Sequence, residues 1–492
     1  MKSTTHTSSK HSEVDSLKLV LAAGLYPFLH YYNGNFDMAD SWLQLGFLLA
    51  ICFLLPAVLL VLTRFIFKLS FLRTLEKYRR TGVNLVVFFG LLAMLIFLGN
   101  KKEIAVVMFG GGMLSFLVYR YLDKIVILQL VLGVLSIFML VPRLWFMATY
   151  TADWTTISTD LNEVQLKHTP NIYVIQPDGY ANFSKLDQPP YSFDNSQFES
   201  YLEAQNFQPY PEFRSNYYST LTSNSSMFAM KHHYYENTYK GNLKTYGSQD
   251  VVVGPYNNTL NILDKNGYTT HFITDNSYFL INGKQTNFDH CNIERSQIKI
   301  YDTGPVYGAD IVPDFEAAIA EMPNGPNFFF IEKTLPSHVM YEASYSDGAV
   351  EERTKYLERL QTANQWLTDL IEVINTYDSN PMIVLVADHG GYVGLDYVKQ
   401  VERKALSDAD KISIFNSLLT IKWPKEIEDR PKVIKSSVNL FRTVFATLGE
   451  NPELMRSEEP NTSFIPKYDR FLGASIYKCI DEEYTPTLEK IE

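Results

Sequence analysis

The chain has 492 residues, of which 46% are hydrophobic and 20% are charged, and its formal net charge is −11. This length predicts about three domain-sized units. The acidic balance argues against a nucleic-acid partner, because binding to a phosphate backbone requires a basic surface. The three cysteines exclude a scaffold held together by many disulfides.

The first third of the chain differs sharply from the remainder. Residues 1–15 are rich in Ser, Thr and His and predict a disordered tail. Apolar runs follow, and the longest of them exceed the ~20 residues that a helix needs to cross a bilayer. Buried core helices are the alternative, but these runs are apolar all round rather than striped. We therefore predict a transmembrane domain over 16–148 with about five spans, near 16–31, 43–67, 83–99, 104–119 and 125–148.

Charge between these runs predicts their orientation. The 64–82 connection carries six Lys and Arg residues, whereas the 32–42 connection carries two Asp and no basic residue. Lys101 and Lys102 oppose this pattern weakly. The positive-inside rule then places the N-terminus in the cytoplasm and everything after about residue 150 outside. We expect no cleavable signal peptide, because the first apolar run lacks a clear cleavage site.

Beyond the spans, the pattern changes to alternating strands and helices. We predict a linker over 149–168 and an α/β domain over 169–492. A long helix is expected from Glu351 to Tyr377, because apolar residues recur at helical spacing from Tyr356 to Leu370. A shorter helix is expected over 438–448. The predicted strands are 171–176, 268–274, the apolar run from 328, 382–387 and 413–422.

Two of these strands end in residues that can bind a metal. The 382–387 strand runs into Asp388 and His389, and the 171–176 strand runs shortly into Asp178 and Gly179. Parallel strands deliver side chains to one edge of a sheet, where α/β enzymes bind ligands. Carboxylate and imidazole groups suit a divalent metal there. The alternative is that each strand is simply followed by a polar turn.

A third segment, 215–230, is dense in hydroxyl residues and leads into an apolar stretch that can be helical. A Ser or Thr at a helix N-terminus can serve only as a cap. The functional interpretation is a nucleophile, because a hydroxyl held on a metal loses its proton more easily.

These three segments, in this order, resemble the sulfatase/alkaline phosphatase superfamily. The branch that the chain most resembles comprises the membrane-anchored phosphoethanolamine and phosphoglycerol transferases, including lipoteichoic acid synthase. In that branch the nucleophile is a Thr seven residues before a Met-Phe pair, a spacing that runs here from Thr220 to Met227. The resemblance implies that Asp178, Thr220, Asp388 and His389 bind the metal. It also implies an extracytoplasmic α/β sandwich like that of alkaline phosphatase.

Other histidines can be compared with the same family pattern. The family places a His that binds substrate phosphate or a second metal after an apolar strand, and His338 fits this position, although the Pro that usually follows is missing. His232 and His233 are more typical of surface or packing residues. No His follows His389, so a single metal is expected, with Zn²⁺ or Mn²⁺ favoured and Mg²⁺ not excluded. The absence of a Cys/Ser-x-Pro-x-Arg motif argues against sulfate-ester hydrolysis.

The resemblance implies transfer of a phosphoethanolamine- or phosphoglycerol-type group from a membrane phospholipid to an extracytoplasmic glycan or lipid. It also implies that the group passes through a phospho-Thr220 intermediate. The expected location is the bacterial cytoplasmic (inner) membrane, with the catalytic domain on the periplasmic or extracytoplasmic side. Two alternatives remain open: a phosphodiesterase or phosphatase with water as acceptor, and a non-catalytic protein of envelope assembly.

The cysteines give one more prediction. Cys291 and Cys479 both lie beyond the last predicted span, where a disulfide can persist, whereas Cys52 lies within a span. We therefore predict a Cys291–Cys479 disulfide. The alternative is two buried free thiols, since unpaired Cys is often buried.

Overall fold

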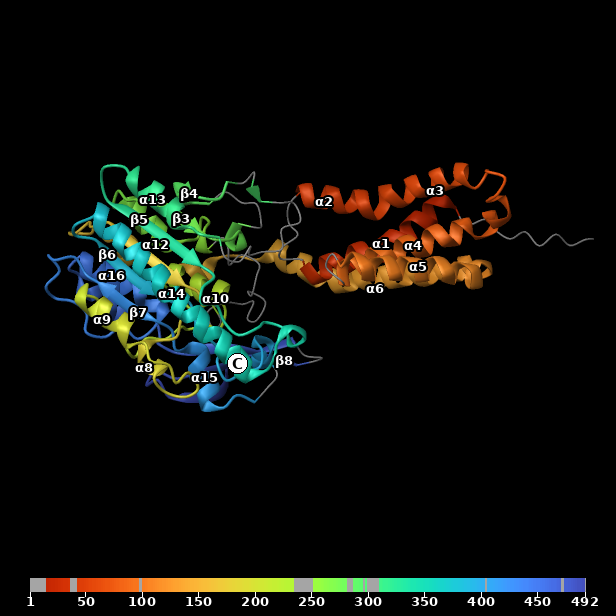
Figure 1. Ribbon diagram of the computed structural model, residues 1–492. Helices are drawn as coiled ribbons and strands as arrows, with labels where there is room; N and C mark the ends of the chain where they lie inside the picture. Colours follow the sequence, from red (N-terminus) through yellow and green to blue (C-terminus); the bar gives the residue numbers. More distant parts are fainter. Residues whose placement is uncertain are drawn as a thin grey trace, which may run out of the picture. The chain divides into compact units, whose positions relative to one another are not determined.

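The chain divides into two compact units, Met1–Thr149 and Tyr150–Glu492, and each is described here by itself (Figure 1). All of the predicted tail except Asp15 lies outside the described residues, and the predicted ends of the tail and linker stay predictions. The computed structural model describes residues 15–35, 42–96, 100–233, 251–280, 286–294, 297–298, 309–402, 405–469 and 473–491.

The first unit is helical, as its apolar composition predicts. Three of its helical stretches are long and apolar enough to cross a membrane: Trp42–Ile66, Arg73–Ile96 and Lys101–Trp145. Among the described residues of this unit, the helix α1 is not one of these candidate spans, because its C-terminal half contains several polar residues. The α-helices are α1 Ser16–Asn35, α2 Trp42–Leu49, α3 Leu55–Ile66, α4 Glu76–Ile96, α5 Lys101–Val118 and α6 Leu122–Thr149, with a π-helical turn at Ala50–Leu54 between α2 and α3.

A seven-stranded sheet forms the centre of the second unit, in the order β2-β7-β6-β1-β5-β3-β4. The strands β1, β3, β4, β5 and β6 run parallel, and β7 runs antiparallel to its neighbours β6 and β2. Their bounds are β1 Ile172–Pro177, β2 Gln208–Pro209, β3 Thr269–Thr274, β4 His290–Cys291, β5 Asn327–Lys333, β6 Met382–Val386 and β7 Leu419–Lys422.

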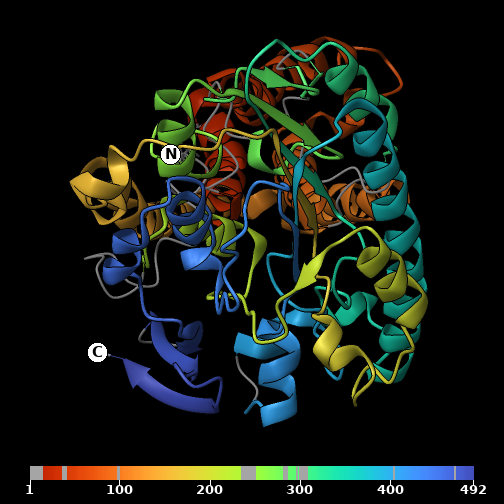
Figure 2. The ribbon, with the colours of Figure 1, turned by 90° about the vertical axis from the view of Figure 1, so that its left-hand side faces the viewer.

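Helices cover both faces of this sheet, as Figure 2 shows for the second unit. Side chains of a strand alternate between its faces, so Ile172 and Val174 enter one core while Tyr173 and Ile175 enter the other. Sheets of mostly parallel strands need such cover, because both their faces are apolar. The helices are α7 Thr159–Asn162, α8 Phe183–Leu186, α9 Ser196–Ala204, α10 Thr220–Ala229, α12 Asn258–Lys265, α13 Val312–Ala320, α14 Ala349–Tyr377, α15 Asp408–Phe415 and α16 Leu440–Leu448.

The predicted α/β architecture is therefore present in the second unit, and the long predicted helix is confirmed as α14. Tyr356, Leu360 and Leu367 of its apolar stripe are fully buried against the sheet. A three-stranded antiparallel sheet near the C-terminus was not predicted. Its strands are β8 Ser463–Asp469, β9 Gly473–Ile480 and β10 Pro486–Ile491.

The strand predicted over 413–422 is wrong in its first half. The capping box of Ser407 and Asp410 starts the helix α15, which continues to Phe415. Only Leu419–Lys422 forms the strand β7. The apolar residues Ile414 and Phe415 suit either structure, so the helix start signal upstream decides between them.

The predicted disulfide is also wrong, because both cysteines are free thiols. Cys291 lies in β4 at the edge of the large sheet and packs on one hydrophobic core. Cys479 lies in β9 of the small sheet and is buried in a different core. Their membership of separate cores explains why they are not bridged.

Candidate active site

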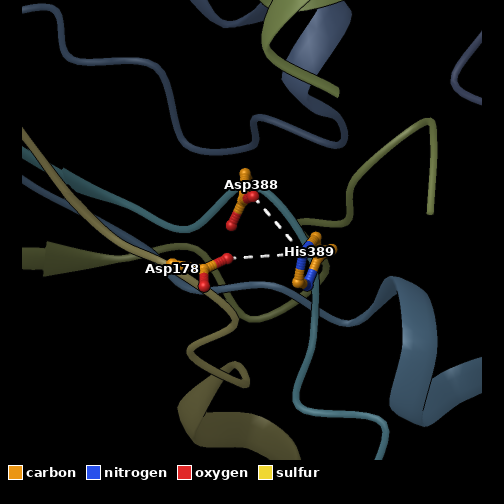
Figure 3. A group of neighbouring side chains, drawn as sticks. All are labelled: Asp178, Asp388 and His389. Carbon is orange, nitrogen blue, oxygen red and sulfur yellow. Dashed lines mark ion pairs between the residues drawn. The ribbon is translucent and has the colours of Figure 1, made fainter. Parts of the chain in front are cut away.

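The two predicted strand ends meet at the C-terminal edge of the sheet. Asp178 follows β1, and Asp388 and His389 follow β6, which pairs directly with β1. His389 Nε2 lies 3.4 Å from Asp178 Oδ1 and 3.4 Å from Asp388 Oδ2 (Figure 3). All three side chains are buried, and their ligand atoms lie within 4.8 Å of one another. The sheet thus brings together residues that are more than two hundred positions apart in sequence.

Thr220 joins this group from a third segment. It is the first residue of α10, and its Oγ1 lies 3.4 Å from Asp178 Oδ1 and 3.4 Å from His389 Nε2. Ser219, its N-cap, and Thr220 are half-buried, whereas the other residues of 213–230 are buried. A substrate can therefore reach Thr220 but not the hydroxyls deeper in the segment.

Those neighbouring hydroxyls have other hydrogen-bond partners. Thr222 Oγ1 donates to the carbonyl of Ser219 at 3.1 Å, and Ser223 Oγ donates to the carbonyl of Tyr217 at 2.8 Å. Both bonds stabilise the start of α10. Of the hydroxyls in this helix, Thr220 is the one that contacts both Asp178 and His389.

The ring of His389 is oriented by its other nitrogen. Nδ1 donates to the carbonyl of Gly390 at 2.9 Å, so in the neutral ring Nε2 carries the lone pair and faces two carboxylates. Burial lowers the pKa of His389, but the two carboxylates reverse this and leave it raised. Burial likewise raises the pKa of Asp388, to about 6, against the opposing effect of His389, and burial raises the pKa of Asp178.

These side chains fit a divalent metal. Asp388 Oδ1 accepts a hydrogen bond from the Gly179 amide at 3.1 Å, whereas Asp388 Oδ2 is buried and has no hydrogen-bond partner among the described residues. A buried carboxylate oxygen without a hydrogen-bond donor requires a proton or a cation, which here is either a metal ion or a protonated His389 at 3.4 Å. Two carboxylates, a hydroxyl and an imidazole suit Zn²⁺ or Mn²⁺ and also allow Mg²⁺.

His338 lies beside this group. Its ring centroid is 5.8 Å from that of His389. Nδ1 donates to the carbonyl of Val339 at 2.6 Å, which leaves the Nε2 lone pair for a ligand. Burial lowers the pKa of His338 to about 4, so the ring is neutral at pH 7. Its assignment to substrate stays a prediction.

His232 and His233 are packing residues and are fully buried, not exposed. The His233 ring stacks on Tyr217 with 4.0 Å between centroids, and His232 Nδ1 lies 2.9 Å from the Tyr217 hydroxyl. The surface alternative for this pair is therefore wrong.

Two residues of α14 hold the site loops, and the sequence patterns did not predict this role. Tyr356 Oη donates to the carbonyl of Gly179 at 2.9 Å and accepts from the Ala181 amide at 3.1 Å. Arg359, one turn along the helix, donates to the carbonyls of the loop that carries His338. In the sequence, Tyr356 is one member of an apolar stripe, and its hydroxyl is the one sign of a polar role.

Tyr392 was not predicted either. The centroid of its ring lies 5.3 Å from the centroid of the His389 ring and 5.8 Å from that of the His338 ring, and both pairs are T-shaped. Its backbone is left-handed, with φ of 60°, which is strained for a bulky residue. Two glycines precede it in the chain, and they are the one sequence signal for an unusual turn here.

The chain with this site geometry is similar to known proteins. The Sulfatase family model matches residues 212–450, a range that includes Thr220, Asp388 and His389, while Asp178 precedes it. The model matches just under half of the chain, and the predicted resemblance to the superfamily is confirmed. None of the curated proteins is a significant match.

Several solved structures are similar to the chain. The C-terminal periplasmic domain of EcEptC from Escherichia coli, in complex with Zn, has a TM-score of 0.43 at 13% identity over 65% of this chain and 94% of that one. The lipoteichoic acid synthase LtaP from Listeria monocytogenes has a TM-score of 0.41 at 15% identity, over 68% and 91%. The integral membrane protein EptA, a lipooligosaccharide phosphoethanolamine transferase from Neisseria meningitidis, has a TM-score of 0.40 at 11% identity, over 87% and 96%. At these scores the resemblance to the family rests on the family model alone.

Proposed function

We propose that this chain is a membrane-anchored, metal-dependent transferase. It moves a phosphoethanolamine- or phosphoglycerol-type group from a membrane phospholipid to a glycan or lipid outside the cytoplasm. The observation that carries this proposal is the position of Thr220. Its hydroxyl is accessible, begins a helix and contacts both Asp178 and His389 at 3.4 Å.

Thr220 is the proposed nucleophile. Its Oγ1 loses its proton and bonds to the donor phosphorus as the bond from phosphorus to the diacylglycerol oxygen breaks, and diacylglycerol takes up a proton and leaves as the alcohol. An acceptor hydroxyl then attacks the phospho-Thr220 phosphorus and releases the threonine. The N-terminus of α10, where Thr220 lies, would favour the negative charge of this phosphate.

Asp178, Thr220, Asp388 and His389 would hold the metal, which supplies a lower pKa for the hydroxyl and positive charge beside the phosphate. The hydrogen bond from His389 Nδ1 to Gly390 fixes which ring nitrogen faces the site. His338, neutral at pH 7, is placed to accept a proton or a hydrogen bond from the substrate.

The membrane placement follows from the first unit. We propose five spans, an N-terminus in the cytoplasm and the sulfatase-family domain on the periplasmic or extracytoplasmic side of a bacterial cytoplasmic membrane. Three apolar helices of sufficient length and the basic 64–82 connection support this arrangement. Anchoring suits the reaction, because the acyl chains of the donor stay in the bilayer.

Transfer is tested with head-group-labelled phosphatidylethanolamine and phosphatidylglycerol, full-length protein and purified envelope glycan. Label on the glycan is expected from the wild type. Released head-group phosphate alone would indicate a hydrolase instead, and no turnover with either lipid would favour a non-catalytic role.

The nucleophile is tested by Thr220→Ala, with Thr222→Ala as the matched control in the same helix turn. Thr220→Ala is expected to abolish transfer and the phosphothreonine found by mass spectrometry, whereas Thr222→Ala keeps both. Full activity of Thr220→Ala would refute the assignment.

A further inference from the structure

A groove lies within the first unit, between α3, α4 and α5. Its volume of about 510 Å³ falls within the ~300–1,000 Å³ typical of small-molecule sites. Glycines at 82 and 112 line it with backbone only, so side chains from three helices leave the space between them unfilled. The other lining residues are mostly apolar, among them Leu59, Val83, Val86, Met108, Met113 and Phe116.

One end of the groove is strongly basic. The segment 67–80 contributes four lining residues, and it also carries five cations. Its one acidic residue, Glu76, is paired with Arg79 at 2.9 Å, so the net charge of the segment is positive. We call these cations the basic collar: Lys68, Arg73, Lys77, Arg79 and Arg80.

The collar is attached to the groove by specific contacts. Arg79 Nη1 donates to the carbonyl of Leu60 at 3.1 Å, which ties α4 to α3 beside the lining. The Lys77 ammonium lies over the ring of Tyr78 at 4.9 Å and over that of Tyr119 at 5.7 Å. Cations held over aromatic rings beside an apolar surface are typical of the boundary between the acyl chains and the head groups of a membrane.

We infer that this groove binds an anionic glycerophospholipid, with an acyl chain along the apolar lining and the phosphate at the basic collar. An apolar groove in a membrane-spanning unit is accessible to lipid chains, and the charge of the collar selects a negative head group. The site goes beyond the proposed transferase function, because none of its residues belongs to the Thr220 site.

The inference is tested by native mass spectrometry of the full-length protein in mild detergent. The probes are phosphatidylglycerol, which is anionic, and phosphatidylcholine with the same acyl chains. Phosphatidylglycerol is expected to bind more tightly, and Lys68→Gln and Lys77→Gln each to weaken it about fivefold, the factor that loss of one surface cation implies. Met113→Trp, which fills the groove, is expected to weaken both lipids.

Matched controls lie in the same unit outside the groove. Lys101→Gln and Lys102→Gln remove exposed cations from the start of α5, and Phe138→Trp adds bulk to an exposed position of α6. These variants are expected to bind both lipids with the affinity of the wild type. Equal loss in test and control variants, or equal affinity for the two lipids, would overturn the inference.

Two further readouts separate lipid binding in the groove from the transfer reaction and from self-association of the chain. Thr220→Ala is expected to retain lipid binding, so failure of the proposed transfer reaction leaves the groove assignment intact. If Met113→Trp instead dissociates a dimer without changing lipid binding, a second copy of the chain occupies the groove and the lipid assignment is wrong.

Discussion

The candidate site contains ionisable side chains that are buried away from water. Asp178, Asp388 and His389 are all buried, and each pKa is shifted in the direction that brings protons into the site. A metal bound among them must displace these protons. The affinity of the site for a metal therefore depends on pH in a range where ordinary carboxylates no longer titrate.

The first prediction concerns this competition. The raised pKa of Asp388, about 6, means that its carboxylate is protonated below that pH and ionised above it. Metal affinity is therefore expected to fall as the pH drops through the raised pKa of His389, and to fall at least about tenfold for each pH unit below about 6, where Asp388 also takes up a proton. Calorimetric titration of metal-free protein with Zn²⁺ or Mn²⁺ between about pH 5 and about pH 8 measures this. An affinity that does not change across pH 6 would contradict it.

At the scale of elements, the site depends on turns that follow two strands and on the helix that holds them. The turn after β1 is bound by the Tyr356 hydroxyl from α14, and a Cβ at Gly391 in the turn after β6 would lie 2.4 Å from the Tyr356 ring. The side chain of Tyr356 thus lies against both turns that carry the proposed metal ligands. Residues in such supporting positions fix the orientation of ligands.

The second prediction follows from Tyr356. Tyr356→Phe keeps the ring but removes both hydrogen bonds to the β1 turn, so metal affinity is expected to fall about tenfold. Tyr173→Phe is the matched control. Tyr173 is buried in the same core, but its hydroxyl contacts Asp378, which lies before β6 at the opposite end of that strand. Each variant is expected to lose about 1 kcal/mol of stability. Equal metal affinity in the two variants would show that Tyr356 only supports the fold.

The third prediction compares two glycines with similar backbones. Gly179 has φ of 70° and Gly267 has φ of 78°, so alanine is strained at both by about 1–2 kcal/mol. A Cβ at Gly179 would also lie 2.6 Å from the carbonyl oxygen of Ser337, whereas nothing lies within 4 Å at Gly267. Gly179→Ala is expected to lower the melting temperature more and to lose metal. Similar melting curves for the two variants would show that the contact between residue 179 and Ser337 does not add to the cost of the substitution.

At the scale of the whole molecule, the proposed reaction requires the second unit and the acceptor to share one side of the membrane. The five proposed spans would place the 64–82 connection and this unit on opposite sides. Charge predicts this arrangement, because six basic residues in one connection resist transfer across a bilayer.

The fourth prediction tests that topology. In a variant without native cysteines, Ser70→Cys and Asp194→Cys introduce single exposed thiols, one in the basic connection and one in the second unit. A membrane-impermeant thiol reagent is expected to label Asp194→Cys in intact cells and Ser70→Cys only after permeabilisation. Labelling of both positions in intact cells, or of Ser70→Cys alone, would reject the five-span arrangement.

Much of this protein was predictable from local patterns. The stripe from Tyr356 to Leu370 predicted α14, because burial on one face of a helix imposes its own period on the sequence. The strand before Asp388 was also predictable, because a strand that is buried on both faces has a continuous apolar run. Parallel strands end at a common edge, so the pairing of Asp178 with Asp388 followed from two local predictions.

Features that depend on distant contacts were decided only by the tertiary structure. The free thiols of Cys291 and Cys479 reflect two separate cores, which their positions in sequence do not reveal. The hydroxyls of 215–230 look equivalent in sequence, and packing against the sheet leaves Thr220 beside Asp178 while it buries those deeper in the helix. Sequence patterns record whether a residue is buried, because burial selects apolar side chains, but they do not record which distant residue it meets.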